Sequence, residues 1–177
     1  MCWLNVIWAP WRSKYIKEVT EGKQDKKQSC IFCEVVKKSD EEALILYRGK
    51  SCYVIMNLYP YNTGHIMVIP YRHVPSIEHL DATELLEMMQ LVKISIKIIK
   101  KALNPDGFNI GINLGRAAGA GVEEHVHIHV VPRWVGDANF MPIVAGVKIL
   151  PQDVRETYNL LKPYYEEVQT NTIFEES

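Results

Sequence analysis

The sequence predicts an α+β fold in which an antiparallel sheet of about five strands packs against a long helix and a C-terminal helix. Four observations predict it. Short apolar runs separated by turn residues fill the first part of the chain, and a long run with helical spacing follows them. Two segments that alternate apolar and polar residues come next, and a second helical run lies near the C-terminus.

The first three strands are predicted from short apolar runs at Ala43–Tyr47, Cys52–Met56 and His65–Ile69. Arg48-Gly49-Lys50 separates the first two runs, and residues 57–64 separate the second from the third. Both connections contain residues that favour turns, so consecutive runs are expected to pair as antiparallel strands.

The long helix is predicted from Asp81 to Leu103. Asp81-Ala-Thr-Glu84 has the spacing of a capping box, in which the first side chain and the fourth satisfy each other's backbone N–H groups. Apolar residues then recur every three or four positions, and Asn104-Pro105 ends the pattern.

The remaining elements follow from alternation and from helical spacing. Phe108–Leu114 and His125–Val130 alternate with a period of two residues and are predicted strands. The Gly/Ala-rich stretch Gly115–Gly121 lies between them as a loop. A second helix is predicted from Gln152 to about Leu161, with Pro163 near its end.

Composition limits the class of protein. The 177 residues are 47% hydrophobic and 23% charged, so the chain can bury a core. The length predicts a single domain over 1–177, with an aromatic and basic arm and loop at 1–29 and a flexible tail at 169–177. Twenty Lys and Arg against 21 Asp and Glu give a net charge of −1, which excludes a protein that coats nucleic acid.

Location is inferred from what the sequence lacks. No run reaches the roughly 18 apolar residues of a membrane span, and Met1–Arg12 lacks the basic start and apolar stretch of a signal peptide. Four cysteines are too few for a disulfide-dense secreted scaffold. We therefore expect a reduced, cytoplasmic protein without a membrane partner.

Three histidines in alternate positions, His125, His127 and His129, are the main functional feature. Strand periodicity places their rings on one face and turns Val126 and Ile128 into the core. A purely structural role does not require histidine at all three positions. Two chemical interpretations remain: a metal site, because H-x-H presents two nitrogens, or a nucleophilic histidine oriented by its neighbours.

The surroundings of the triplet favour the nucleophile. The Gly/Ala-rich loop before it can bring backbone N–H groups to an anion. Asn113, on the polar face of the preceding predicted strand, can donate to a phosphate oxygen. Imidazole is largely unprotonated at neutral pH and can attack phosphorus, so the pattern indicates chemistry on a phosphate.

Cys30-Ile-Phe-Cys33 forms a C-x-x-C with three interpretations: a redox pair, half of a zinc site, or two buried thiols without chemistry. The redox interpretation requires a thioredoxin-like βαβ context, which the sequence does not show. A zinc site requires two further ligands from elsewhere in the chain.

The histidine segment also resembles a known family. H-V-H-I-H-V-V, at His125 to Val131, is similar to the motif of the histidine-triad (HIT) family of nucleotide-binding and hydrolysing proteins. Further segments resemble the bacterial diadenosine tetraphosphate phosphorylase branch of this family. Next to the histidines these are N-L-G-R-A-A-G-A-G-V-E-E before them, and P-R-W and the run to Phe140 after them. Earlier in the sequence they are W-A-P-W-R-S-K-Y-I and N-L-Y-P-Y-N-T-G-H (Asn57 to His65). These motifs extend from about residue 8 to 165. The resemblance implies a HIT-like fold.

The resemblance also implies roles for individual residues. His127 attacks the α-phosphorus of an adenine nucleotide and forms a covalent nucleotidyl-histidine, while His129 contacts the phosphate. Asn113 and Gly121 help to hold the anion. Asn57 matches the position that holds the ribose in this family. Arg133 and Trp134 are expected to have secondary roles, in phosphate contact or at an interface.

One stretch departs from the hydrolase branches of the family. Ala120-Gly121-Val122-Glu123-Glu124 is one residue longer than in those branches and lacks their Gln. Glu124 resembles a glutamate of the phosphorylase branch that orients a histidine or governs phosphate entry, although both glutamates also suit a solvated turn. The departure favours the phosphorylase branch.

The resemblance supplies the missing metal ligands as well. His73 and His125 are the implied partners of Cys30 and Cys33 in a structural zinc site. His125 then fixes the strand, and His127 does the chemistry. His79 is expected at the surface or as a cap, and His65 beside the nucleotide site without an assigned role.

The implied function is phosphorolysis of diadenosine tetraphosphate to ATP and ADP by a homodimeric nucleotidyl transferase, with inorganic phosphate as second substrate. Two alternatives remain open. One is a hydrolase of dinucleoside polyphosphates or nucleoside phosphoramidates on the same fold. The other is a non-catalytic nucleotide-binding module.

Overall fold

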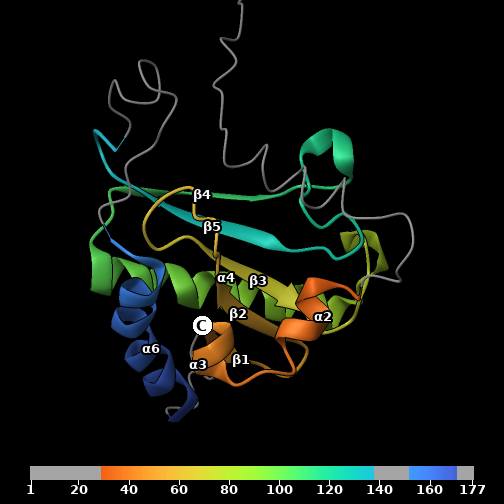
Figure 1. Cartoon of the computed structure of the whole chain (residues 1–177), viewed down its shortest axis with the longest axis horizontal. Helices are drawn as coiled ribbons and strands as arrows, with labels where there is room; N and C mark the ends of the chain where they lie inside the picture. Colours follow the sequence, from red (N-terminus) through yellow and green to blue (C-terminus); the bar gives the residue numbers. More distant parts are fainter. Residues whose placement is uncertain (1–28, 138–151, 171–177) are drawn as a thin grey trace, which may run out of the picture.

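The computed structural model describes residues 29–137 and 152–170, and these residues form a five-stranded antiparallel sheet in the order β1-β2-β3-β5-β4 (Figure 1). The predicted α+β class is confirmed. In chain order the elements are α2 (Ile31–Val35), α3 (Asp40–Ala43), β1 (Ile45–Arg48), β2 (Cys52–Met56), β3 (Ile66–Pro70), η1 (Ile77–His79), α4 (Ala82–Leu103), β4 (Gly107–Ile112), η2 (Arg116–Ala118), β5 (Ile128–Arg133) and α6 (Val154–Thr170).

The long helix forms where the sequence predicts it. Asp81 caps α4 by accepting from the backbone N–H groups of Thr83 and Glu84, and the Glu84 carboxylate accepts from the Asp81 N–H. At the other end Asn104 takes the left-handed conformation, with φ of 46°. The predicted capping box and stop signal are therefore both present.

The histidine strand begins later than predicted. β5 starts at Ile128, so His125 and His127 precede it in an extended segment. The Val126 N–H donates to the Val74 carbonyl oxygen, at 2.8 Å, and so bonds the segment after β3 instead of a neighbouring strand. The alternation still holds, because Val126 and Ile128 are buried in the core beneath α4.

The C-terminal helix is longer than predicted. The sequence predicts its end near Leu161, whereas α6 continues to Thr170 with Pro163 inside it. Pro163 lies on the exposed side, while Leu161 and Tyr165 are fully buried. Burial of that face, together with a hydrogen bond of 2.8 Å from the Tyr165 hydroxyl to Ser95 Oγ on α4, offsets the one backbone bond that proline cannot make.

The two faces of the sheet differ in what covers them. On one face a large cluster of buried side chains joins the strands to α4 and α6. The other face carries a smaller cluster around Phe32, Tyr53, Ile55 and Met67, to which the described part of the chain adds the short helices α2 and α3. Among the described residues, this second face is therefore the less covered of the two.

Several predictions reach beyond the described residues. The arm at 1–29 lies outside them except for Ser29, and so does the tail after Thr170. The single domain over 1–177 stays a prediction. Within 29–137 and 152–170, no helix has the length and apolar character that crossing a membrane requires.

Candidate active site

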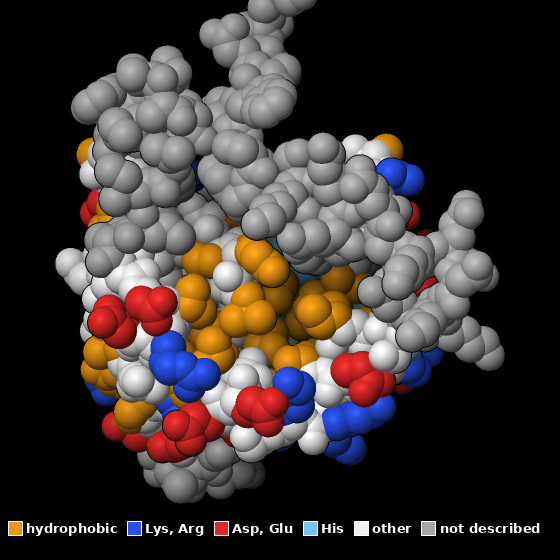
Figure 2. Space-filling view, viewed as in Figure 1, with side chains coloured by type: hydrophobic (Ala, Val, Ile, Leu, Met, Phe, Trp, Pro, Cys, Tyr) orange, Lys and Arg blue, Asp and Glu red, His pale blue; other side chains and the backbone are white. Residues whose placement is uncertain are grey.

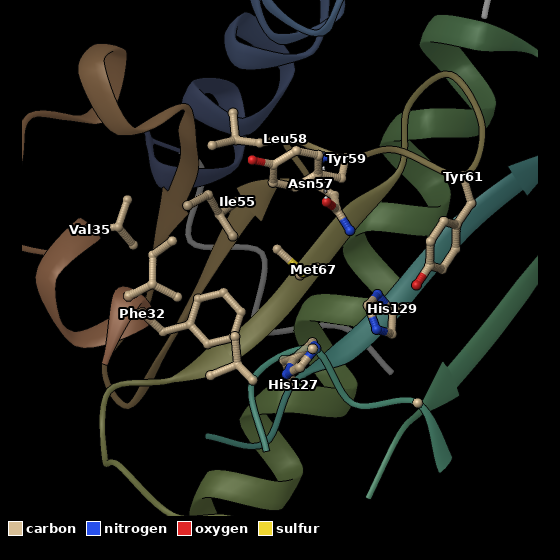
Figure 3. A pocket seen from close by; sticks show the side chains of 14 residues that line it. Phe32, Val35, Ile55, Asn57, Leu58, Tyr59, Tyr61, Met67, His127 and His129 are labelled. Atoms are coloured by element: carbon tan, nitrogen blue, oxygen red, sulfur yellow. Dashed lines mark hydrogen bonds between the residues drawn. The ribbon is translucent and has the colours of Figure 1, made fainter. Parts of the chain in front are cut away.

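A cavity of about 140 Å³ opens on the second face of the sheet, between α2 and the histidine segment. Figure 2 shows hydrophobic side chains gathered in a hollow of this face. Most of the wall is apolar, and the polar side chains Asn57, His127 and His129 lie together on one side (Figure 3). The lining residues are Ile31, Phe32, Val35, Ile55, Asn57, Leu58, Tyr59, Tyr61, Met67, Gly119, Gly121, Val122, His127 and His129.

The helix α2 forms one wall of this cavity and positions two of the histidines. Tyr53, which is fully buried in β2, donates its hydroxyl to the Phe32 carbonyl oxygen at 3.0 Å and so ties α2 to the sheet. The Phe32 ring then packs edge-on against His125 and His127, with ring centroids 5.5 and 5.0 Å away. One buried aromatic side chain thus limits the rotation of both imidazoles.

The environment of His127 leaves one of its nitrogens available for chemistry. His127 is 4% exposed, and its Nδ1 lies 2.9 Å from the His125 carbonyl oxygen. A carbonyl can only accept, so Nδ1 carries the proton and Nε2 of the neutral ring keeps its lone pair. Burial lowers the pKa of His127, which keeps the ring neutral at neutral pH. His127 therefore offers a free nitrogen at the cavity.

His65 fixes the proton on its neighbour His129. The Tyr61 backbone N–H donates to His65 Nδ1 at 3.0 Å, so the proton of the neutral ring is on Nε2. That nitrogen lies 3.0 Å from His129 Nδ1, which must accept, and the proton of neutral His129 is then on Nε2. The Asn57 amide nitrogen lies 3.4 Å from the same Nε2, but both groups are donors in this arrangement, so that contact is not a hydrogen bond.

The protonation state of His65 agrees with this arrangement. Its side chain is fully buried, and burial, with a smaller contribution from His129 and His127, lowers the pKa of His65 to about 3. His65 therefore stays neutral and acts as a donor to His129. The sequence places His65 near the site but gives it no role, because the contact joins residues 64 positions apart.

A cluster of two cysteines and two histidines lies beside the cavity, as the family resemblance implies. Its members are Cys30, Cys33, His73 and His125. Their ligand atoms all lie within 4.8 Å of one another. His125 Nδ1 lies 3.3 Å from Cys30 Sγ and 3.6 Å from Cys33 Sγ. His73 Nδ1 lies 3.5 Å from Cys33 Sγ and 3.3 Å from His125 Nδ1. These four residues can hold a metal ion.

The donor set fits tetrahedral zinc. With Zn–N bonds of about 2.05 Å and Zn–S bonds of about 2.3 Å, two nitrogens lie about 3.3 Å apart and a nitrogen and a sulfur about 3.5 Å apart. The one N···N and three N···S separations given above are close to these values. His125 Nε2 donates to the Pro70 carbonyl oxygen at 2.8 Å, which leaves the Nδ1 lone pair for the metal.

Other predicted site residues fall in different places. Asn57 lines the cavity, and its Oδ1 accepts from the Tyr59 N–H at 2.8 Å, which fixes the turn after β2. Gly121 also lines the cavity. Asn113 follows the end of β4, and Glu124 is exposed; neither belongs to the cavity wall.

The residues at the end of β5 donate hydrogen bonds to other groups of the protein. Arg133 donates to the Asp137 carboxylate through Nε and Nη2, at 2.6 and 2.7 Å, and to Asn109 Oδ1 through Nη1. Trp134 Nε1 donates to the Asn104 carbonyl oxygen at 3.1 Å. Arg133 thus has internal partners in place of the phosphate contact considered from the sequence.

The site combines a nucleophile with an adjacent donor. The His127 and His129 rings have centroids 4.8 Å apart and both line the apolar cavity, so a ring with an unprotonated Nε2 neighbours a ring with a protonated Nε2. An electrophilic phosphorus placed there meets the first nitrogen, and an oxygen bonded to that phosphorus meets the second. The geometry suits transfer of a phosphorus-centred group to histidine.

Comparisons with known proteins agree with the fold and the site. The sequence profile of the HIT domain family matches residues 38–135. A protein of Mycobacterium tuberculosis named AP-4-A phosphorylase is 46% identical over 162 residues, which are 89% of this chain and 83% of its own length.

Two solved structures share the architecture. A Zn-bound histidine triad family protein from Mycobacterium smegmatis superposes with a TM-score of 0.64 and 26% identity, over 82% of this chain and 99% of that one. A hypothetical histidine triad nucleotide-binding protein from Sulfolobus tokodaii strain7 gives 0.63 and 27%, over 84% of this chain and 100% of its own. With its profile match, its sheet and its histidine triplet, the chain belongs to the HIT family.

Proposed function

We propose that the protein is a nucleotidyl transferase that cleaves diadenosine tetraphosphate with inorganic phosphate and yields ATP and ADP. The observation that carries the proposal is the lone pair on His127 Nε2, held beside the Nε2–H donor of His129 at the cavity. The choice of substrate is supported by the 46% identity to a protein named AP-4-A phosphorylase.

The first half-reaction transfers AMP to the protein. His127 Nε2 attacks the α-phosphorus, a P–N bond forms, and the bond from that phosphorus to the bridging oxygen breaks. ATP leaves, and the His129 Nε2–H stabilises negative charge on an oxygen of the reacting group. His127 Nδ1–H, bonded to the His125 carbonyl, stabilises the positive charge that develops on the ring.

The second half-reaction releases the AMP unit. An oxygen of inorganic phosphate attacks the same phosphorus, and the P–N bond breaks as the P–O bond of ADP forms. The electron pair of the broken bond returns to His127 Nε2, so the ring regains its starting state. Water in place of phosphate would give AMP and make the protein a hydrolase.

The cavity supplies the nucleoside site in this proposal. Its apolar wall, which includes Phe32 and Leu58, accepts the adenine, and Asn57 holds the ribose. The backbone at Gly121 holds the phosphate, with Asn113 as a further donor and Glu124 at the entrance for inorganic phosphate. These assignments agree with the positions of Asn57 and Gly121 in the cavity wall, whereas Asn113 and Glu124 lie outside it.

Phosphate dependence tests the reaction. With diadenosine tetraphosphate as substrate, ATP and ADP are the expected products, and the rate rises with phosphate concentration until it saturates. Chromatography of the nucleotides, with and without phosphate, measures both quantities. Equal rates in both conditions with AMP and ATP as products would show a hydrolase.

Replacing the nucleophile tests the covalent mechanism. His127→Asn removes the attacking nitrogen, and kcat is expected to fall by about 10³-fold or more while nucleotide binding persists. His79→Asn is the matched control, because His79 is exposed in η1, away from the cavity. Rapid quenching with labelled substrate should trap a nucleotidyl adduct in wild type and in His79→Asn but not in His127→Asn. Full turnover by His127→Asn would exclude the mechanism.

The metal in the four-residue cluster is proposed to be zinc with a structural role. When bound, it fixes α2 to His125 and thereby the start of the histidine segment. Its chemistry is confined to that structural bond, because all four tetrahedral positions are taken by protein ligands.

Metal analysis tests the zinc site. One zinc per chain is expected, and Cys33→Ser should lose it and lower the thermal midpoint by at least about 4 °C, because a structural metal stabilises the fold. Cys52→Ser is the control, since Cys52 is a buried thiol in β2 outside the cluster and should leave the zinc content unchanged. Wild-type protein without zinc, when purified free of chelator, would contradict the site.

A homodimer is proposed through the edge strand β4. This strand forms one edge of the sheet. Ile110 in the strand is 45% exposed, and Leu114 just beyond it is 39% exposed. An apolar sheet edge without charged protection favours pairing with another strand.

Sedimentation velocity tests the dimer. Wild type is expected at twice the chain mass, and Ile110→Lys should shift it toward monomer because a charge would then face the partner strand. Leu160→Lys on α6, where Leu160 is 40% exposed, is the matched surface control. Monomeric wild-type protein at micromolar concentration would refute the assembly.

A cytoplasmic location is part of the same proposal. Zinc binding requires Cys30 and Cys33 as reduced thiolates, and Cys52 is a third free thiol. A reducing compartment preserves all three.

A further inference from the structure

A buried carboxylate just after the histidine strand, Asp137, links the end of β5 to one loop of the active site. The Asp137 side chain is 7% exposed. It accepts from Arg133 Nε and Nη2 at 2.6 and 2.7 Å, from Asn62 Nδ2 at 2.7 Å, and from the Trp134 N–H at 3.1 Å. A buried carboxylate with this many donors is held in one position.

Through Asn62, Asp137 holds the loop that connects β2 to β3. Asn62 is 4% exposed, and its Nδ2 also donates to the Pro132 carbonyl oxygen in β5, at 3.0 Å. Within the loop the His65 N–H donates to the Asn62 carbonyl oxygen, and the Asn57 N–H donates to the His65 carbonyl oxygen. The loop is therefore closed on itself and attached to β5 through Asn62.

The same loop sets the protonation pattern of the active site. Tyr61, the residue before Asn62, donates its backbone N–H to His65 Nδ1, and His65 Nε2 in turn faces His129 Nδ1. A displacement of Asn62 by a few tenths of an ångström moves the Tyr61 N–H with it. Without that donor, no other described contact places the His65 proton on Nε2, and the hydrogen bond that His65 donates to His129 Nδ1 is weakened.

We infer that Asp137 is a positioning residue for the reaction: through Asn62 and Tyr61 it keeps His65 as a donor to His129, and so keeps the His129 Nε2–H directed at the phosphate. The tautomer assignment stands on geometry alone. Its consequence for turnover rests on the proposed nucleotidyl transfer.

The structure contains a second carboxylate clamp that provides a control. Glu87, on α4, accepts from the backbone N–H groups of Lys50 and Ser51 at 2.6 and 2.7 Å and so holds the turn between β1 and β2. That turn lies at the β1 side of the sheet, and β5, with His129, is separated from it by β3. Glu87→Gln thus weakens a loop clamp of the same chemistry that has no link to the histidines.

The experiment compares Asp137→Asn, Asn62→Ala and Glu87→Gln in the full-length, zinc-loaded protein. Long-range ¹H–¹⁵N spectra of histidine-labelled protein report which ring nitrogen carries the proton, and His65→Asn and His129→Asn assign the signals. Unfolding midpoints of all variants are recorded in parallel. The turnover of diadenosine tetraphosphate with phosphate gives kcat and KM.

The wild type is expected to show His65 and His129 each protonated on Nε2. In Asp137→Asn and Asn62→Ala one or both should become mixtures of tautomers, with kcat lower by about tenfold and a smaller change in KM. Glu87→Gln should keep the wild-type spectrum and kcat, even if its unfolding midpoint falls as much as those of Asp137→Asn and Asn62→Ala.

Wild-type histidine spectra in both folded variants would overturn the inference, and so would an equal spectral change in Glu87→Gln. Asn62→Ala carries the test alone if Asp137→Asn does not fold. If the wild type does not turn over diadenosine tetraphosphate, the proposed function fails, while the tautomer comparison still decides the role of Asp137.

Discussion

A hydrogen bond to one ring nitrogen sets the proton position of each histidine of the triplet His125, His127 and His129. A neutral imidazole carries one proton, so an acceptor on one nitrogen leaves a lone pair on the other, and a donor has the opposite effect. The Pro70 carbonyl leaves the His125 Nδ1 lone pair for the proposed metal, and the His125 carbonyl leaves the His127 Nε2 lone pair for the proposed nucleophilic attack. His65, as a donor, prepares His129 to donate in turn. Three identical side chains thereby acquire three different roles.

These hydrogen bonds depend on a sheet whose two faces are covered unequally. On one face α4 and α6 bury the apolar side chains that alternate with the histidines. On the other face the short α2 leaves a cavity open, and its Phe32 packs on two of the histidine rings. Cys30 and Cys33 flank Phe32, so a metal bound to them would fix α2 against the segment that carries the nucleophile. The metal site and the reaction site therefore share one short helix.

Much of the fold was predictable because it depends on local patterns. The capping box at Asp81 and Glu84 and the apolar spacing behind it define α4 without reference to other elements. Alternation predicted which side of the histidine segment faces the core. Element ends were less predictable: β5 starts at Ile128 because the residues before it bond to Val74, and α6 passes Pro163 because its buried face continues. Both outcomes depend on contacts distant in sequence.

The sequence by itself determined the class of fold, the histidine triplet and the resemblance that linked Cys30 and Cys33 to His73 and His125. Local periodicity and short motifs encode these features, so one sequence suffices. Only the tertiary structure decided which nitrogen of each ring carries the proton, because the partners are backbone carbonyls and distant side chains. The contact of His65 with His129 spans 64 positions, and that of Asn62 with Asp137 spans 75. No periodic pattern encodes pairings at such separations, since they form only when the strands assemble.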